Sequence, residues 1–309
     1  MAKKGNSIPI LLLTAILVSA MQSGTYAGEA SASAPIPAGR TVIRKVPVIG
    51  DADMPVPARQ DLSVLADGLP YPGEVRLSDG TAWVALREFT RFADGSGAES
   101  QVCWDGVQNA ATVSSASLAL KAVAGDRILT ANGRALLCPE PVRIENDVLW
   151  VPLRTLSRAF GYQCTYDPDG PAALLTRLSD AVEPRDETGE DQVFWLSRII
   201  EAEAGAEPFE GKLAVGSVIL NRVGSDEFPD TVWGVIFDDC NGVQFSPTEN
   251  GTIWTEPGED SLLAARITLD NPPVWDDIEY FLNPALASSL WIPASREYAF
   301  TIGSHEFYY

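Results

Sequence analysis

The sequence of 309 residues has very little histidine: His305 is the only one. Zinc amidases and peptidases hold their metal with two or three imidazoles, so this count excludes such a site. A Ser-His-Asp hydrolase would have to use His305, and no nucleophile-elbow motif accompanies it. Carboxylates, in contrast, are abundant, with 42 Asp and Glu residues, and they suit glycoside chemistry.

Basic residues are also scarce. The chain has 22 Lys and Arg against 42 acids, which gives a formal net charge of −20. Such a chain does not bind nucleic acid through a surface that neutralises phosphates. Anionic polymers would repel it at long range, so any contact with them must be local and screened by salt.

The first residues have the pattern of a secretory signal peptide. Lys3 and Lys4 form a basic start, residues 8–20 are almost wholly apolar, and residues 25–27 (Thr-Tyr-Ala) offer a cleavage site before Gly28. An uncleaved anchor is the alternative, but this apolar core is short for a membrane span, and no later segment approaches the length of one. We therefore expect residues 1–27 to be removed and the mature chain to be exported.

Cysteines are few but even in number, and an exported protein permits disulfides. Three connectivities are possible, and the sequence does not choose between them. We expect at most one bridge within the N-terminal domain, with Cys240 free; four reduced thiols are the alternative. The cysteines are Cys103, Cys138, Cys164 and Cys240.

About 280 mature residues suggest two domains, because single cores rarely grow beyond 250–300 residues. Residues 28–60 are rich in Ala and Pro and predict an extended linker. Residues 179–190 are polar and acidic, contain Pro and Gly, and predict a second linker. The two domains are then 61–178 and 191–309.

The N-terminal domain contains a weak internal repeat. Residues 83–92 (WVALREFTRF) are echoed by residues 150–159 (WVPLRTLSRA), and strand-like runs that end in turns follow at 101–106 and 163–170. Each unit predicts a strand, a short helix, a strand, a turn and a strand. The unit resembles the stalk-like repeats of copper amine oxidase N-terminal domains. The resemblance implies a structural spacer, with a ligand-binding module as the alternative, and without histidine or a thiol cluster it does not imply copper.

The C-terminal domain opens on an apolar helical stripe that ends in a carboxylate. Leu196, Ile199, Ile200 and Glu203 fall at i, i+3, i+4 and i+7, one face of a helix, whereas Glu201 points away from it towards solvent. A carboxylate that ends such a stripe is poorly solvated, so its pKa rises. A carboxylic acid that stays protonated at neutral pH can protonate a glycosidic oxygen. The alternative is a glutamate at a helix end whose head reaches water.

This segment resembles the opening of the SleB-type cell wall hydrolase family, and the resemblance runs through the whole C-terminal domain. It rests on residues 200–223, 244–247 (Gln-Phe-Ser-Pro), 280–284 and 302–305 (Ile-Gly-Ser-His). One departure is that Gly-Ala stands at 205–206, where the family usually has Arg-Gly. The resemblance implies a mainly helical, lysozyme-like domain with a small β-sheet, so the fold class expected for the chain is α+β.

Periodicity and turn residues give more detail for this domain. We expect a first helix that ends near Ala204, a second, buried helix over 213–220 that Pro208 begins and 221–222 ends, and a third helix over 261–269. Strands are expected at 279–282 and 298–302.

The resemblance also implies an activity and a catalytic residue. It implies cleavage of the peptidoglycan glycan strand, often as a lytic transglycosylase, with Glu203 as the single acid and base and with no metal or cofactor. A hydrolase would need a second carboxylate or a held water. Glu207 is the nearest candidate, but beside Pro208 it favours a helix N-terminus instead.

Further residues of the motifs are candidates for substrate contact. Gln244 and Ser246 could donate to sugar groups, with a surface turn as the alternative. Tyr280 and Asn283 could line the sugar site together with Phe281, with packing in the core as the alternative. For His305 a structural hydrogen bond is expected rather than catalysis.

Two other functions stay open: a non-catalytic wall-binding or spore-coat assembly protein, and an N-acetylmuramoyl-L-alanine amidase, which the single histidine disfavours. The expected location is secreted, in the cell wall or spore cortex. The sequence does not distinguish cortex from vegetative wall, and it does not say whether a regulatory protein restrains the enzyme.

Overall fold

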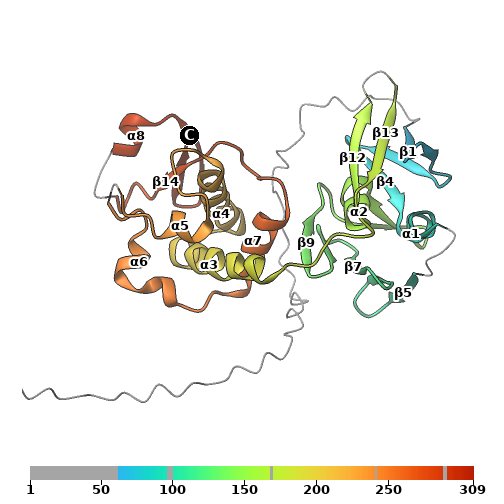
Figure 1. Ribbon diagram of the computed structural model, residues 1–309, viewed down its shortest axis with the longest axis horizontal. Helices are drawn as coiled ribbons and strands as arrows, with labels where there is room; N and C mark the ends of the chain where they lie inside the picture. The colour runs from blue at the N-terminus through green and yellow to red at the C-terminus, as the bar shows by residue number, and fades with distance from the viewer. Residues whose placement is uncertain (1–61, 96–99, 168–169, 241, 288–290) are drawn as a thin grey trace, which may run out of the picture. The chain divides into compact units, whose positions relative to one another are not determined.

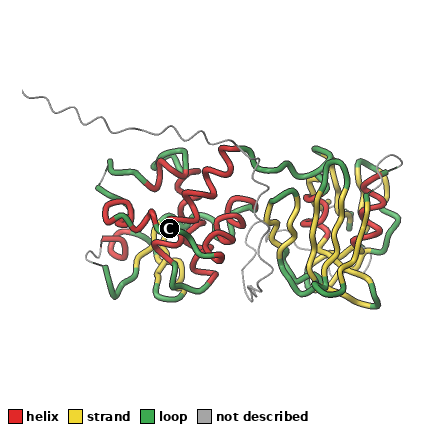
Figure 2. Tube along the Cα trace, turned by 90° about the horizontal axis from the view of Figure 1, so that it is seen from below, coloured by secondary structure: helices red, strands yellow, loops and turns green. Residues whose placement is uncertain are grey.

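The computed structural model describes residues 62–95, 100–167, 170–240, 242–287 and 291–309, all of which belong to one compact unit, 35–309. The expected signal peptide and the expected linker at 28–60 lie outside the described residues. Strands fill the N-terminal part of the described chain and helices most of the C-terminal part (Figure 2). The α+β prediction is confirmed. No helix of the described segments is long and apolar enough to cross a membrane.

Three sheets make up the N-terminal part. The first has the strand order β12-β13-β1-β2, the second β10-β11-β4-β3, and the third is an antiparallel meander from β5 to β9. Their bounds are β1 Ser63–Ala66, β2 Leu69–Pro70, β3 Val75–Ser78, β4 Thr81–Ala85, β5 Gln101–Asp105, β6 Ala110–Ser114, β7 Ala119–Val123, β8 Ile128–Ala131, β9 Arg134–Leu137, β10 Arg143–Glu145, β11 Val148–Pro152, β12 Tyr162–Asp167 and β13 Ala172–Arg177.

The internal repeat is a structural repeat. Strand β4 leads into α1 (Leu86–Asp94), and β11 leads into α2 (Leu153–Ala159), each followed by a hairpin (Figure 1). The two copies meet where β4 and β11 pair antiparallel, with Val84 opposite Val151. Side chains alternate across a strand, so both valines enter the main core while Trp83 and Trp150 point to the other face.

On that other face each copy covers the tryptophan of the other. The guanidinium of Arg76 lies 3.7 Å from the ring centroid of Trp150, and that of Arg143 lies 4.1 Å from Trp83. Both indoles are buried, and cation–π contacts strengthen when they are shielded from water. This crossed pair explains why the Trp-Val motif occurs twice: each copy completes the packing of its partner.

The C-terminal part is built around three helices, α3, α4 and α7, with a small sheet of order β14-β16-β15 (Figure 1). Helix α4 is buried along most of its length, as predicted, and at Gly216 an added Cβ would lie 2.8 Å from Thr268 Oγ1 of α7. The bounds are α3 Glu187–Ala204, α4 Phe209–Gly224, α5 Val232–Ile236, α6 Ser246–Asn250, the 3-10 helix η1 Thr252–Trp254, α7 Glu259–Asp270, β14 Tyr280–Leu282, α8 Trp291–Ser295, β15 Tyr298–Ile302 and β16 His305–Tyr308.

Most of the expected elements are present. The first helix ends at Ala204 as predicted, and the helices predicted at 213–220 and 261–269 are longer at both ends. Pro208 is the residue that caps the start of α4 rather than part of its first turn. Helix α3 begins at Glu187, inside the stretch expected to be a linker, because Asp186 caps it by accepting from the Gly189 N–H at 2.8 Å. Strand β16 was not predicted.

All four cysteines are free. The expectation of at most one bridge therefore resolves to none. Cys138 is buried among apolar side chains, and burial raises the pKa of its thiol to about 12, which leaves it unreactive at neutral pH.

One buried carboxylate lies at the end of α7. The side chain of Asp270 is fully buried and accepts hydrogen bonds from Arg134, Arg185 and the Ala135 N–H of β9. The guanidinium of Arg158 donates to the Asp270 carbonyl. A buried charge is tolerated only when partners surround it, so this cluster fixes the end of α7.

We predict that Asp270→Ala lowers the free energy of unfolding by about 3–5 kcal/mol, because it leaves buried guanidinium groups without a partner. Urea titration followed by circular dichroism measures the change. Asp276→Ala removes an exposed carboxylate one loop later and should change stability by less than about 0.5 kcal/mol. A similar small change at Asp270 would show that the cluster does not hold the fold.

Candidate active site

Glu203 lies one residue before the end of α3, where the apolar stripe of that helix stops. Leu196, Ile199 and Ile200 are fully buried, as the periodicity predicted, and Glu203 is half-buried. Burial alone raises the pKa of Glu203 to about 7, since neither a hydrogen bond nor a nearby charge opposes it. The carbonyl end of a helix also disfavours an anion. Glu203 is thus a carboxyl group that exchanges its proton near neutral pH.

The end of α3 is held by a buried lysine on α4. Lys212 is 4% exposed and donates to the carbonyls of Ala204 (2.8 Å) and Gly205 (2.6 Å). These carbonyls have no partner within the helix, so the ammonium group satisfies them and fixes the turn that follows Glu203. Lys212 was not predicted, although a lysine directly before the apolar run 213–220 was a signal.

The expectation for Glu201 was wrong. It does not point into open solvent: its carboxylate accepts from Ser261 Oγ (2.6 Å) and from the Gly258 N–H (3.0 Å) at the start of α7. Burial alone would raise its pKa, but these two hydrogen bonds and Lys212 lower the pKa overall. Glu201 therefore stays ionised and ties α3 to the start of α7. Of the two glutamates, only Glu203 has a raised pKa.

Glu207 is engaged by the turn between β15 and β16. Its carboxylate accepts from the Ser304 N–H (3.0 Å) and from Ser304 Oγ, and these bonds are the main reason that its pKa is lowered. Gly303 makes the contact possible: its φ is +59°, and an added Cβ would lie 1.9 Å from Glu207 Oε2. Glu207 precedes α4 as expected, but its partner is this turn.

His305 is buried and packs edge-on against Phe281, with ring centroids 5.4 Å apart. Its Nδ1 has no hydrogen-bond partner among the described residues and lies 3.8 Å from Glu207 Oε1, so the expected structural hydrogen bond is not made there. Burial lowers the pKa of His305 despite this carboxylate, and the imidazole is neutral at neutral pH.

The four residues considered for substrate contact differ in exposure. Ser246 is exposed, and Gln244 is half-buried with its side-chain amide on the Gly242 carbonyl at 3.1 Å. Tyr280 is 6% exposed, and its hydroxyl is hydrogen-bonded to Arg296. Tyr280 thus fits the alternative of packing in the core. Asn283 donates to Ser304 Oγ at 3.1 Å and so joins the turn that holds Glu207.

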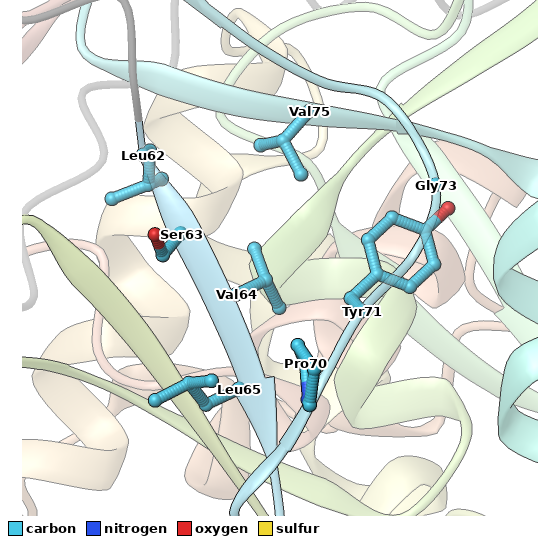
Figure 3. Close-up of a pocket in the computed structure, with 8 residues that line it drawn as sticks. All are labelled: Leu62, Ser63, Val64, Leu65, Pro70, Tyr71, Gly73 and Val75. Atoms are coloured by element: carbon cyan, nitrogen blue, oxygen red, sulfur yellow. The ribbon is translucent and has the colours of Figure 1, made fainter.

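A pocket of about 330 Å³ lies in the N-terminal part, away from these residues (Figure 3). Its lining comes from the start of β1 and from the segment that leads from β2 into β3, and it includes the Tyr71 ring and the side chains of Val64 and Val75. It brings together no groups for catalysis. No cluster of three or more histidines, cysteines or carboxylates that could hold a metal occurs in the described segments.

Comparison with known proteins gives matches to two separate parts of the chain. Residues 206–308 match the Cell Wall Hydrolase family, and residues 73–174 match the Copper amine oxidase N-terminal domain. The C-terminal part is a cell wall hydrolase domain. The match begins at Ala206, so it does not include Glu203.

Spore cortex-lytic enzymes are similar to this domain. That of Oceanobacillus iheyensis is 40% identical over 115 residues, which is 36% of this chain and 39% of that protein. That of Bacillus subtilis is 38% identical over 115 residues, 36% of this chain and 35% of that protein. The chain therefore spans less than two fifths of the length of these relatives.

A solved structure is also similar: the catalytic domain of the germination-specific lytic transglycosylase SleB from Bacillus anthracis. It is 32% identical, with a TM-score of 0.35, and the similarity covers 40% of this chain and 97% of that domain.

The raised pKa of Glu203 predicts a pH-dependent stability. Between pH 4.5 and about 7 the folded protein keeps a proton that the unfolded chain has lost, so folding is opposed increasingly as the pH rises. Glu203→Gln removes this penalty. Its free energy of unfolding should exceed that of the parent by an amount that grows over this window and reaches the order of 3 kcal/mol above pH 7.

Urea titrations of both proteins from pH 4 to pH 8 measure this difference. Asp191→Asn replaces an exposed carboxylate of the same helix by an amide and is the control for this type of substitution. A difference between Glu203→Gln and the parent that does not change with pH would mean that Glu203 has an ordinary pKa.

Proposed function

We propose that the C-terminal domain cleaves the glycan strand of peptidoglycan as a lytic transglycosylase, with Glu203 as its acid and base. The contrast between two carboxyl groups carries the proposal. Burial raises the pKa of Glu203 to about 7, so this carboxyl group exchanges its proton near neutral pH, while Glu207, four residues later, is ionised and hydrogen-bonded to Ser304. When the surroundings of two carboxyl groups shift their pKa values in opposite directions, the group with the raised pKa is the candidate for the general acid.

The occupied Glu207 favours transglycosylation over hydrolysis. A glycosidase needs a second carboxylate that acts as a nucleophile or activates a water. Glu207 has both oxygens in hydrogen bonds to Ser304 and is therefore poorly suited to either role. Glu201 is likewise bound to the start of α7. A mechanism that uses one carboxyl twice requires neither.

In the first step Glu203 donates its proton to the glycosidic oxygen, and the bond from that oxygen to C1 of the muramic residue breaks. The carboxylate of Glu203 then accepts the proton of the C6 hydroxyl as O6 attacks C1. The proton returns to Glu203, and no water is consumed. The product has a 1,6-anhydromuramoyl end, whereas attack by water would give a reducing end.

The fixed helix end gives this residue its geometry. Lys212 and Glu201 anchor the last turn of α3 to α4 and α7, so the backbone that carries Glu203 is fixed before substrate arrives. Among the residues considered for sugar contact, Ser246 and Gln244 remain accessible enough to donate hydrogen bonds. Asn283 supports the turn that holds Glu207 through its bond to Ser304, whereas Tyr280 is packed with its hydroxyl on Arg296.

The N-terminal repeats are proposed to be a spacer, and the domains to be 61–178 and 191–309, as expected from the sequence. The relatives act on spore cortex by name, and we propose cortex or vegetative wall as the location of this enzyme. Digestion of both materials distinguishes the two.

Glu203→Gln keeps the size of the side chain but cannot donate a proton, so turnover should fall by at least about 10²-fold. Activity of the parent should decline as the pH rises through about 7, because the protonated acid is lost. Release of muropeptides from purified sacculi and cortex, followed by mass spectrometry, measures both effects and identifies the anhydro ends.

Asp191→Asn is the matched control and should retain activity, since that exposed carboxylate lies at the other end of α3. Glu201→Gln is not a silent control because Glu201 holds α7. Near-parental turnover in Glu203→Gln would overturn the assignment, and products with only reducing ends would replace transglycosylation by hydrolysis.

Export is proposed from the N-terminal pattern, with cleavage before Gly28. Intact-mass measurement of protein collected from outside the cell should give a chain that starts at or near this glycine. Retention of residues 1–27 in that material would contradict cleavage.

A further inference from the structure

An exposed row of aromatic rings lies on the cell wall hydrolase domain. Trp254 of η1, Trp195 of α3, Phe237 after α5 and Trp233 of α5 follow one another, with successive ring centroids 5.6, 5.2 and 5.1 Å apart. We call these four side chains the aromatic row. Trp195 and Phe237 are half-buried, whereas Trp233 is 56% and Trp254 64% exposed. Two large indoles left open to water at the ends of such a row are typical of a binding surface.

The aromatic row is continuous with the helix that carries Glu203. Trp195 and Glu203 are both half-buried residues of α3, at i and i+8. The eight steps from Trp195 to Glu203 span about 12 Å of helix axis. Helix α3 also packs against α5, α6 and η1, which carry the other rings and the exposed Ser246 (Figure 1). A polymer bound at Glu203 could therefore extend onto the row.

The size of the row limits what can bind it. Trp233 and Trp254 together expose roughly 300 Å². A stable protein partner needs about 800 Å² on each side. A single chain of sugar rings needs much less, because each pyranose presents an apolar C–H face about as large as one aromatic ring.

Charge also favours contact through the uncharged faces of sugar rings. The protein carries a net charge of −20, and Asp238, Asp239 and Glu256 lie close to the row in sequence. The nearby Arg198 is already paired with Glu256 at 2.7 Å. An anionic lipid surface would be repelled, and so attraction to a wall that carries anionic polymers must come from uncharged contacts. Stacking of sugar on indole is such a contact.

We propose that the aromatic row binds sugar residues of the peptidoglycan strand beyond those at the cleavage point, and so selects long glycan over short fragments. This inference rests on the proposed function, since it takes the same strand as the substrate.

Binding is measured with peptide-free glycan strands, in a Glu203→Gln background so that the strand stays uncut. Removing both exposed rings (Trp233→Ala with Trp254→Ala) should weaken binding, and the dissociation constant should rise about tenfold or more for each ring. The tryptophan-to-phenylalanine pair keeps a ring at each position and should restore most of the affinity. Added salt should not weaken binding, because the stacking contacts include no attractive ion pair and salt screens the repulsion between the acidic protein and the lactyl carboxylates of the strand.

Trp104→Ala is the matched control, since Trp104 is 46% exposed on β5 of the N-terminal part. Its binding should match the Glu203→Gln parent. Three results would each overturn the proposal. The double alanine variant could bind glycan as its parent does, or Trp104→Ala could lose as much binding. The double alanine variant could also lose a dimer, seen by sedimentation, while its glycan binding is unchanged. Failure of the proposed function appears separately, as muropeptide release that persists in Glu203→Gln.

Discussion

A half-buried carboxyl group that nothing in its surroundings neutralises is the constraint around which this domain is organised. Glu203 owes its raised pKa to burial alone. Such a group opposes folding once it ionises, so the helix end that carries it must be fixed by other contacts. Lys212 caps the carbonyls beside it, and Glu201 ties the same turn to the start of α7. Lys212, Glu201 and Glu207 all have hydrogen-bond partners, whereas burial alone acts on the carboxyl group of Glu203.

Helix α7 connects this site to the rest of the compact unit. Its first turn receives Glu201, and its last residue, Asp270, is buried between Arg134 and Arg185. Both ends of one helix are therefore held by charge-assisted hydrogen bonds, which are stronger than neutral ones. The repeat domain gains its own rigidity from the crossed pairs of arginine and tryptophan. The result is a stiff support for a residue whose burial is unfavourable.

The sequence predicted what depends on local pattern. The stripe that ends at Glu203, the helices α4 and α7 and the repeat of the Trp-Val motif all follow from periodicity. Contacts between distant segments were not predictable: the Ser304 turn that occupies Glu207, the exchange of partners between the repeats, and the bond from Glu201 to Ser261. The expectation that Glu201 faces solvent was wrong for this reason. Helical spacing gives the direction of a side chain, but it does not show which distant segment packs on that side.

The most direct test of this account is the pKa of Glu203 itself. Carbon-13 NMR of protein labelled at the glutamate carboxyl carbon, with Glu203→Gln to assign the signal, follows its titration from pH 3 to pH 9. We expect a midpoint of about 7 for this carboxyl group. A midpoint near the ordinary value of 4.5 would mean that Glu203 is ionised at neutral pH, and it would contradict the role of this residue as the acid.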